Sequence, residues 1–307
     1  MIKVILILLQ LSFFILVAPF LSGLITKIKN FLRMRIGQSI FQPYYNIIKL
    51  FSKGEVVSEV VSWIFKVTPF VVVSSTLTAA LLIPVFIIFS PAYYMGDFLA
   101  LIFIFALGRF FLALAALDAG SSFGGMGSSR EMFISSLVEP ALCFVVFAIS
   151  LQFGSTNIMA FSGAHPVTVS SIVIAVALFL AVIAETSRIP VDNQETHLEL
   201  TMVHEAMILE YSGRSLALIE LAAHIKQMIW FFLIAQIIFP IAAPGLSSLT
   251  GLFFWGLWYF GRVFIIAIIV ALVEVSVAKM RLFRVADFLG FISVLGIIAI
   301  ICAILGV

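Results

Sequence analysis

Six ionisable residues lie inside long apolar segments, where a buried charge could take part in ion transfer. They are Arg109, Glu139, Glu220, His224, Lys226 and Arg262. An ionisable side chain within a membrane span is costly, so each is a candidate functional residue. Glu220 and His224 are four residues apart and would share a helix face, whereas Lys226 would point elsewhere. Three more acidic residues lie at the ends of apolar segments: Asp118, Glu185 and Glu274.

These residues permit two interpretations. In the first, Arg109, Lys226 and Arg262 pair with Glu139 and Glu220 as internal salt bridges that fix helix packing. In the second, which we favour, the residues form a proton or ion relay, because a buried carboxylate near a cation can exchange a proton when that cation moves. The predicted ion-coupling residues are Arg109, Asp118, Glu139, Glu220, His224, Lys226, Arg262 and Glu274.

The elements that would hold these residues are membrane spans. The chain has 307 residues, of which 63% are hydrophobic and only 10% charged, against about 25% charged in soluble globular proteins. This composition excludes a soluble globule, a disordered chain and a nucleic-acid-binding protein with a basic surface. The apolar runs are unbroken, whereas a transmembrane barrel would alternate. We therefore predict an all-α polytopic membrane protein.

Eight segments approach the roughly 20 residues that a membrane-spanning helix needs. They are Val4–Thr26, Val67–Phe89, Asp97–Asp118, Ser129–Phe153, Pro166–Glu185, Ser215–Phe239, Leu252–Glu274 and Ala286–Gly306. A basic cluster follows the first run directly, which is typical of a stop-transfer segment rather than a cleaved signal peptide. We expect one integral membrane domain over residues 1–307, with its main loops at about 27–66 and 186–214.

The basic residues predict which side of the membrane each loop faces. The odd-numbered loops contain 13 Lys and Arg residues, the even-numbered loops contain none, and only Lys3 lies opposite, at the N-terminus. The positive-inside rule therefore places the odd loops in the cytoplasm and both termini outside. No internal repeat is evident, which disfavours a self-sufficient transporter built from inverted repeats.

Two cytoplasmic segments have further recognisable patterns. In the first loop, Tyr44, Ile47, Ile48 and Phe51 recur at helical spacing beside Lys49 and Lys53, ending at Gly54; this predicts an amphipathic helix that anchors at the interface, walls a cavity or receives a partner. The glycine-rich segment 118–131 lacks the G-K-[ST] of a phosphate-binding loop. We expect a tight turn there, and then a capping box from Ser128 to Glu131 that opens a span.

The sequence predicts neither a metal site nor a cofactor in this chain. Cys143 and Cys302 lie in separate apolar runs, and an iron–sulfur cluster needs four thiolates. Only His224 of the four histidines is within a span, so a bis-histidine haem is not expected. His197 and His204 would share a helix face with Thr201, but no H-E-x-x-H motif is present.

The fifth loop is dense in carboxylates, and Leu198, Met202, Ala206 and Leu209 form an apolar stripe that predicts an amphipathic helix. Its residues carry a resemblance to the complex I subunit 1 (NuoH) family, whose signature is E-x-x-R-x-P-x-D, an acidic stretch and then E-Y-S-G. The matching positions are Glu185, Arg188, Pro190, Asp192, Glu210, Tyr211, Ser212 and Gly213. The first-loop helix and Trp63–Pro69 are also similar to that family. Together with the eight spans and the outward termini, the resemblance covers nearly the whole chain.

Within the family, the chain most resembles the membrane subunit of group 4 membrane-bound NiFe hydrogenases, including hydrogenase-4 and formate hydrogenlyase complexes. Three segments carry this likeness: Asn193–Met207, Arg109–Ser121 and Ser129–Pro140. Asn46 stands where many relatives have Asp, and Gln38 where Pro is common. Both departures weaken the inference, made by analogy with complex I, that this chain has an entrance for a quinone.

The resemblance implies a mechanism with several partners. Iron–sulfur clusters and a NiFe centre are expected in partner subunits, an iron–sulfur small subunit and a NiFe large subunit, while this chain carries no redox centre. It would link electron transfer in those docked subunits to proton or sodium translocation by antiporter-like membrane subunits. The residues implied at the docking junction are Glu185, Arg188, Asp192, Glu195, Glu199, Glu205 and Glu210.

Two alternatives remain. The chain could be the equivalent subunit of a complex I-like dehydrogenase that reduces a quinone, or, more remotely, a stand-alone ion transporter. Nickel content and hydrogen evolution distinguish the hydrogenase from the quinone reductase, and activity of the isolated chain in liposomes would identify a transporter.

Overall fold

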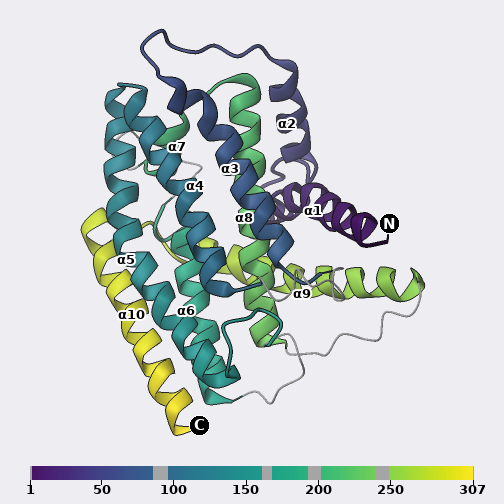
Figure 1. The fold of residues 1–307 in the computed structure, drawn as a ribbon. Helices are drawn as coiled ribbons and strands as arrows, with labels where there is room; N and C mark the ends of the chain where they lie inside the picture. Colours follow the sequence, from purple (N-terminus) through teal and green to yellow (C-terminus); the bar gives the residue numbers. More distant parts are fainter. Residues whose placement is uncertain (1, 86–95, 161–167, 193–201, 240–248, 307) are drawn as a thin grey trace.

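The described part of the chain, shown in a computed structural model, is built of α-helices (Figure 1). The structure describes residues 2–85, 96–160, 168–192, 202–239 and 249–306. The helices are α1 (Ile2–Leu32), α2 (Gln42–Ser52), α3 (Trp63–Leu82), α4 (Phe98–Asp118), α5 (Ser122–Phe153), α6 (Val169–Glu185), α7 (His204–Ile208), α8 (Gly213–Ile238), α9 (Leu249–Ser276) and α10 (Leu282–Leu305). The predicted all-α fold is confirmed.

Seven of the described helices are long and apolar enough to cross a membrane: α1, α3, α4, α5, α8, α9 and α10. The remaining predicted span, Pro166–Glu185, corresponds to α6, which has 17 residues. At 1.5 Å per residue α6 is about 26 Å long, slightly less than the roughly 30 Å hydrocarbon core. The eight predicted spans thus appear as seven long helices and one shorter apolar helix.

Helix α8 is the central element of the bundle. It packs against α1, α2, α3, α6 and α9, and its segment Met228–Ile237 is buried. Trp230 is fully buried there, with its ring edge-on to Phe98 of α4 at 6.2 Å between centroids. Because α8 is enclosed by its neighbours, its polar residues Gln227 and Gln236 are buried among other helices.

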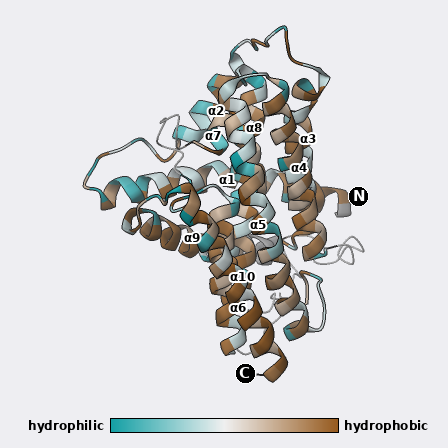
Figure 2. Cartoon of the chain, turned by 90° about the vertical axis from the view of Figure 1, so that its left-hand side faces the viewer, coloured by the Kyte–Doolittle hydropathy of each residue, from teal (hydrophilic) through white to brown (hydrophobic). Residues whose placement is uncertain are grey.

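The remaining helices surround α8. Helix α3 packs against α4, and α5 packs against both α4 and α10. In Figure 1, α4, α5 and α8 run along the bundle while α1 and α9 lie across it. Figure 2 shows hydrophobic colours along α6 and α10 and more hydrophilic colours around α2 and α7. The polar groups therefore gather toward one end of the bundle.

The end of the first span differs from the prediction. Helix α1 continues through Leu32 instead of ending at Thr26, and the chain then turns at Met34 and Gly37, which have positive φ angles. The predicted amphipathic helix is confirmed as α2, with a C-cap at Lys53. Of its apolar residues Ile47 is buried, whereas Ile48 is 65% exposed, so only part of the predicted face packs against the bundle.

The predicted capping box at Ser128 and Glu131 is wrong. Helix α5 begins at Ser122, where the Ser121 side chain accepts a hydrogen bond from the Gly124 amide. The predicted tight turn is present but short: it covers residues 119–121, where Gly120 has a positive φ, and the rest of the glycine-rich segment is helical. Gly127 permits a close approach of α7, because a Cβ there would lie 2.8 Å from the Ala206 Cβ. The hydroxyl of Ser128 is buried and donates to the Ala113 carbonyl at 3.1 Å.

The predicted helix of the fifth loop is described only in part. Helix α7 covers His204–Ile208, and Leu198 lies outside the described residues. Met202 and Ala206 are buried as the apolar stripe predicts, but Leu209 is 51% exposed. The stripe ends early because α7 stops at Ile208 and the chain turns toward α8.

Candidate functional site

A cavity of about 670 Å³ lies among α1, α3, α4, α8 and α9 and the segment after α6. Its lining includes both acidic and basic side chains. Those that carry or can carry charge are Lys29, Arg33, Arg35, Arg109, Glu131, Glu185, Arg188, Asp192, His204, Glu205, Glu220, His224, Lys226 and Glu274. Residues far apart in sequence thus form one charged chamber inside an apolar bundle.

Glu185 is one centre of the charge network. It is 6% exposed at the end of α6, and its carboxylate lies 2.6 Å from the Arg109 guanidinium and 3.0 Å from the Lys226 ammonium. Arg109 also donates to the Ser135 hydroxyl at 2.8 Å. A buried charge requires a partner, and here one carboxylate binds two cations from α4 and α8.

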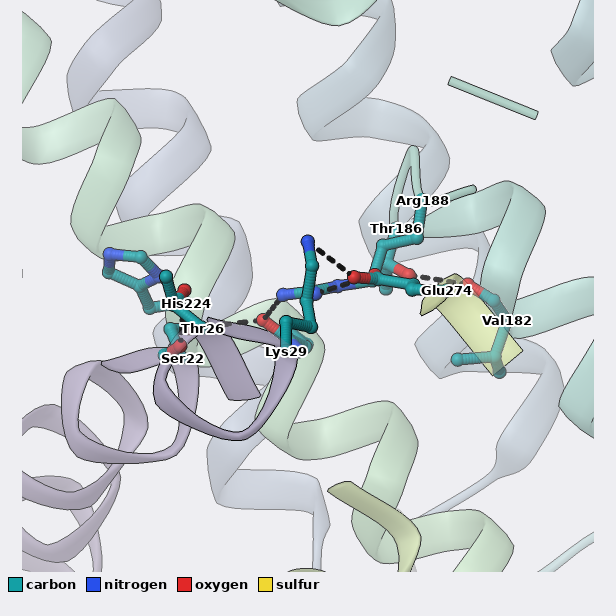
Figure 3. A network of polar contacts seen from close by, with 9 residues as sticks. Ser22, Thr26, Lys29, Val182, Thr186, Arg188, His224 and Glu274 are labelled. Atoms are coloured by element: carbon teal, nitrogen blue, oxygen red, sulfur yellow. Dashed lines mark hydrogen bonds and ion pairs between the residues drawn. The ribbon is translucent and has the colours of Figure 1, made fainter. Parts of the chain in front are cut away.

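Glu274 is the second centre, on α9. Its two carboxylate oxygens each lie 2.7 Å from a cation, Lys29 of α1 and Arg188 after α6. Figure 3 shows the Glu274 carboxyl between the ends of these two side chains. Lys29 and Glu274 are both buried, so this pair also forms away from bulk water.

Hydrogen bonds extend the second centre toward α8. Arg188 donates from its other terminal nitrogen to Gln227 Oε1 at 2.7 Å. The Ser22 hydroxyl donates to the same oxygen at 3.0 Å, and it lies 2.8 Å from Nδ1 of His224. The network therefore continues from Glu274 through Arg188 and Gln227 to His224.

The signature around Glu185 follows from the chain path after α6. The Arg188 amide donates to the Ile183 carbonyl at 3.0 Å, which folds the chain back over the helix end. Asp192 is 1% exposed and accepts from the Val203 amide at 3.3 Å. Its other oxygen lies 2.7 Å from the Lys279 ammonium. This turn directs Glu185 and Arg188 into the cavity, while Asp192 fixes the loop.

The predicted ion-coupling residues do not all meet. The structure gathers most of them at the cavity wall: Arg109, Glu220, His224, Lys226 and Glu274. Lys226, which we expected to point elsewhere, lines the same cavity as Glu220 and His224. Glu220 makes no ion pair within the described part of the chain. The interpretation that paired Arg109, Lys226 and Arg262 with Glu139 and Glu220 agrees with the structure for Arg109, which lies 3.9 Å from Glu139. It is wrong for Lys226, which binds Glu185.

Two predicted residues, Asp118 and Arg262, lie away from these two centres, and Glu139 lies at the edge of the first. Asp118 accepts from the amide and hydroxyl of Ser62 at 2.8 and 2.9 Å, and so fixes the start of α3. Arg262 donates to the Phe239 carbonyl at 2.9 Å and lies 4.4 Å from the Tyr259 ring. Glu139 is 3.9 Å from Arg109, but its side chain is 41% exposed on α5.

The predicted docking residues divide by burial. Glu185 and Asp192 are buried, and Arg188 binds Glu274 in the cavity, so these three are not exposed docking groups of this chain. Glu205 lines the cavity and Glu210 is exposed beside α8. The positions Glu195 and Glu199 lie outside the described residues.

Sequence reasoning missed three members of the network around Glu274. Lys29 was assigned to topology, although the buried residues Phe14, Ala18, Leu21 and Ile25 recur at helical spacing and Lys29 continues their face. Gln227 and Ser22 were not considered because they are uncharged. A polar side chain inside an apolar run could have been weighed as a hydrogen-bonding partner for the nearby charges.

The described residues contain no group of three or more His, Cys, Asp and Glu residues that could hold a metal ion. The chemistry available in the cavity is ion pairing and proton exchange between carboxylates, cations and the imidazoles of His204 and His224.

Comparison with known proteins shows to which family the chain is related. A family model described as NADH dehydrogenase matches residues 3–305. Hydrogenase-4 component C of Escherichia coli (strain K12) is 32% identical over 92% of this chain and 90% of that protein. Formate hydrogenlyase subunit 4 of the same strain is 32% identical over 87% of each chain.

More distant proteins share the fold. A subunit of the NADH-quinone oxidoreductase of Ralstonia pickettii (strain 12J) is 24% identical over 75% of this chain and 71% of that protein. A chain of the membrane-bound sulfane sulfur reductase, an archaeal respiratory membrane complex, superposes with a TM-score of 0.82 at 19% identity. That match covers 99% of this chain and 100% of the other, so the whole bundle is similar.

Proposed function

Because this chain belongs to the NADH dehydrogenase family of membrane proteins, we propose that it is the ion-coupling membrane subunit of an oxidoreductase complex of the hydrogenase type. The observation that carries the proposal is the pair of buried carboxylates, Glu185 and Glu274, each held between two cations on the walls of one cavity. Such paired charges inside an apolar bundle can store and release a proton when a pair separates.

The hydrogenase assignment is supported by the relatives. Hydrogenase-4 component C and formate hydrogenlyase subunit 4 match at 32% identity, against 24% for the protein from the NADH-quinone oxidoreductase. In this proposal the iron–sulfur clusters and the NiFe centre belong to docked soluble subunits. This chain forms the membrane base beneath them, and antiporter-like subunits adjoin it in the membrane.

The coupling step follows from electrostatics. While Arg109 and Lys226 both contact Glu185, the ionised carboxylate is favoured; withdrawal of either cation favours the protonated form. Moving one charge across a membrane costs roughly 2.3 kcal/mol per 100 mV, so the redox reaction in the partner subunits must supply the energy. In this proposal the residues of this chain carry out no redox chemistry. They hold and exchange a proton, or they pass on the displacement of a charge.

Glu139 provides a route out of the cavity. Its carboxylate is near Arg109 yet partly exposed on the side of α5. A carboxylate facing hydrocarbon is unfavourable, and a neighbouring membrane subunit would cover it. In this proposal the disturbance passes from Glu185 through Arg109 to Glu139.

Sidedness completes the proposal. In this proposal the first and fifth loops lie in the cytoplasm with the soluble subunits and both termini lie outside, which the concentration of Lys and Arg in the odd loops supports.

The test is isolation of the intact complex through an affinity tag on this chain. We expect nickel and iron in the preparation, hydrogen evolution from a low-potential donor, and ion uptake into liposomes that depends on that reaction. A preparation without nickel that reduces a quinone would instead support the complex I-like alternative. Ion transport by the chain alone would support a transporter.

A further inference from the structure

The first loop crosses the N-terminus of α8 and is bonded to it. The Val56 amide donates to the Ser212 hydroxyl at 2.9 Å, and the same hydroxyl donates to the Val56 carbonyl at 2.9 Å. Ser212 is the N-cap residue of α8, yet its side chain makes no capping bond to the helix. One hydroxyl therefore holds the loop backbone by both of its hydrogen-bonding groups.

The next residues bring the two segments into direct contact. Gly213 has a φ of 52°, and a Cβ at this position would lie 2.5 Å from the Gly54 carbonyl oxygen. Only glycine permits both that conformation and that approach. The Ser215 hydroxyl donates to the Glu55 carboxylate. The negative charge of Glu55 near the first turn of α8 is also favourable for the helix dipole.

The other end of the loop is held by Tyr211. Its ring stacks on Phe65 of α3, with 4.0 Å between centroids and 6° between planes. Its hydroxyl donates to the Phe65 carbonyl at 3.0 Å. Burial raises the pKa of Tyr211 above its usual range, so the phenol remains a hydrogen-bond donor.

We propose that these contacts form a loop clasp, defined as Lys53–Val56 and Phe65 bonded to Tyr211–Ser215, which positions α8 for ion coupling. Helix α8 carries Lys226 to Glu185 and Gln227 to Arg188. Lys226 is 14 residues beyond Ser212, about 21 Å along the helix at 1.5 Å per residue. A rigid helix fixed at its start transmits a displacement of the first loop to these contacts. Ser212 is thus a positioning residue.

This inference rests on the proposed function, because a docked subunit must displace the loop. The experiment compares Ser212→Ala, which removes both bonds to Val56, with Ser212→Thr, which keeps the hydroxyl. Two quantities are measured on the intact complex: amide hydrogen exchange at Val56, and ions transported per hydrogen evolved in liposomes. Loss of the hydrogen bond from the Val56 amide should speed exchange of that amide on the order of tenfold.

For Ser212→Ala we expect that faster exchange, together with hydrogen evolution close to the wild-type rate and a drop in ions per hydrogen of at least about threefold. Ser212→Thr should retain both wild-type values. Faster exchange with an unchanged ion ratio would overturn the proposal, since the clasp would then serve stability alone. Loss of the soluble subunits from Ser212→Ala would also overturn it, because Ser212 would then belong to the docking surface.

Glu55 provides an independent variant if Ser212→Ala fails to fold. Glu55→Gln keeps an acceptor for the Ser215 hydroxyl, whereas Glu55→Ala does not. We expect a lowered ion ratio only for Glu55→Ala, and equal ratios in the two variants would contradict the clasp. A failure of the proposed function would be seen in the wild-type complex itself, as a lack of nickel or of ion transport that depends on hydrogen evolution. It is therefore distinguishable from a failure of the clasp.

Discussion

At the scale of single residues, the unusual feature is that a few buried carboxylates each bind more than one cation. Glu185 binds Arg109 and Lys226, and Glu274 binds Lys29 and Arg188. A buried ion pair contributes little net stability compared with apolar packing, but removal of one partner is strongly destabilising. The arrangement therefore adds little to the stability of the fold, but it makes the charge network sensitive to the loss of any one ion pair.

The first prediction concerns Glu185. Glu185→Gln keeps the shape of the side chain but leaves two cations without their shared carboxylate, so we expect the free energy of unfolding in detergent to fall by about 3–5 kcal/mol. Glu139→Gln is the matched control. Its carboxylate is 41% exposed and 3.9 Å from Arg109, so its loss should cost less than about 1 kcal/mol. Equal thermal stability of the two variants would contradict the network.

The same control has its own functional prediction. In liposomes, Glu139→Gln should lower ion transport more than it lowers hydrogen evolution, because Glu139 connects Arg109 to the outer face of α5. Ion transport per hydrogen is the quantity to measure. If that ratio is unchanged, Glu139 contributes to packing and not to the relay.

At the scale of elements, close helix packing depends on the glycine-rich start of α5. Gly127 faces the segment around α7: a Cβ there would lie 2.8 Å from the Ala206 Cβ and 2.9 Å from the Val203 carbonyl oxygen. Gly125, only two residues away, has no heavy atom within 4 Å of its Cβ position. The two glycines share a helix but differ in what surrounds them.

This contrast gives an element-scale prediction. Gly127→Ala should destabilise the protein by about 1–3 kcal/mol, the usual cost of overpacking, and should loosen residues 202–209. Gly125→Ala should be neutral or stabilising by up to about 1 kcal/mol, since alanine favours the helix. Thermal unfolding in detergent and amide exchange at Ala206 measure both effects. An equal response of the two variants would show that α7 does not pack as described.

At the scale of the whole molecule, the described polar groups concentrate toward one end of the bundle (Figure 2). That end carries the exposed Glu210 and the first loop, where Val56, Val60 and Trp63 are also exposed. Exposed apolar and charged side chains together are typical of an interaction surface. In our proposal the soluble subunits cover this surface.

Docking gives a prediction at this scale. Reversal of charge in Glu205→Lys with Glu210→Lys should release the soluble subunits during mild detergent extraction, because repulsion replaces attraction across the interface. Arg284→Glu, in the first turn of α10, is a control that reverses a charge elsewhere. Subunit content after affinity purification is the measurement. A complete complex from the double variant would refute the docking surface.

Much of the fold could be predicted from the sequence. Apolar runs of about 20 residues located the spans because a membrane helix must satisfy its backbone internally, and helical spacing located α2. The signature from Glu185 to Gly213 led to the family because those residue types stand at fixed positions. Helix ends were less reliable: α1 continued to Leu32 and α5 began at Ser122, since local signals for turns were overridden by packing against neighbouring helices.

The ion-pair partners were decided only by the tertiary structure. The sequence identified Arg109, Lys226 and Glu185 as unusual, but periodicity describes one helix at a time. Which carboxylate meets which cation depends on how α4, α6 and α8 pack around one cavity. Lys29 illustrates the same limit: its charge matched a topology signal, and only the continuation of α1 beside α9 brought it to Glu274. The sequence thus determined where charge is placed along the chain, and packing determined which charges act together.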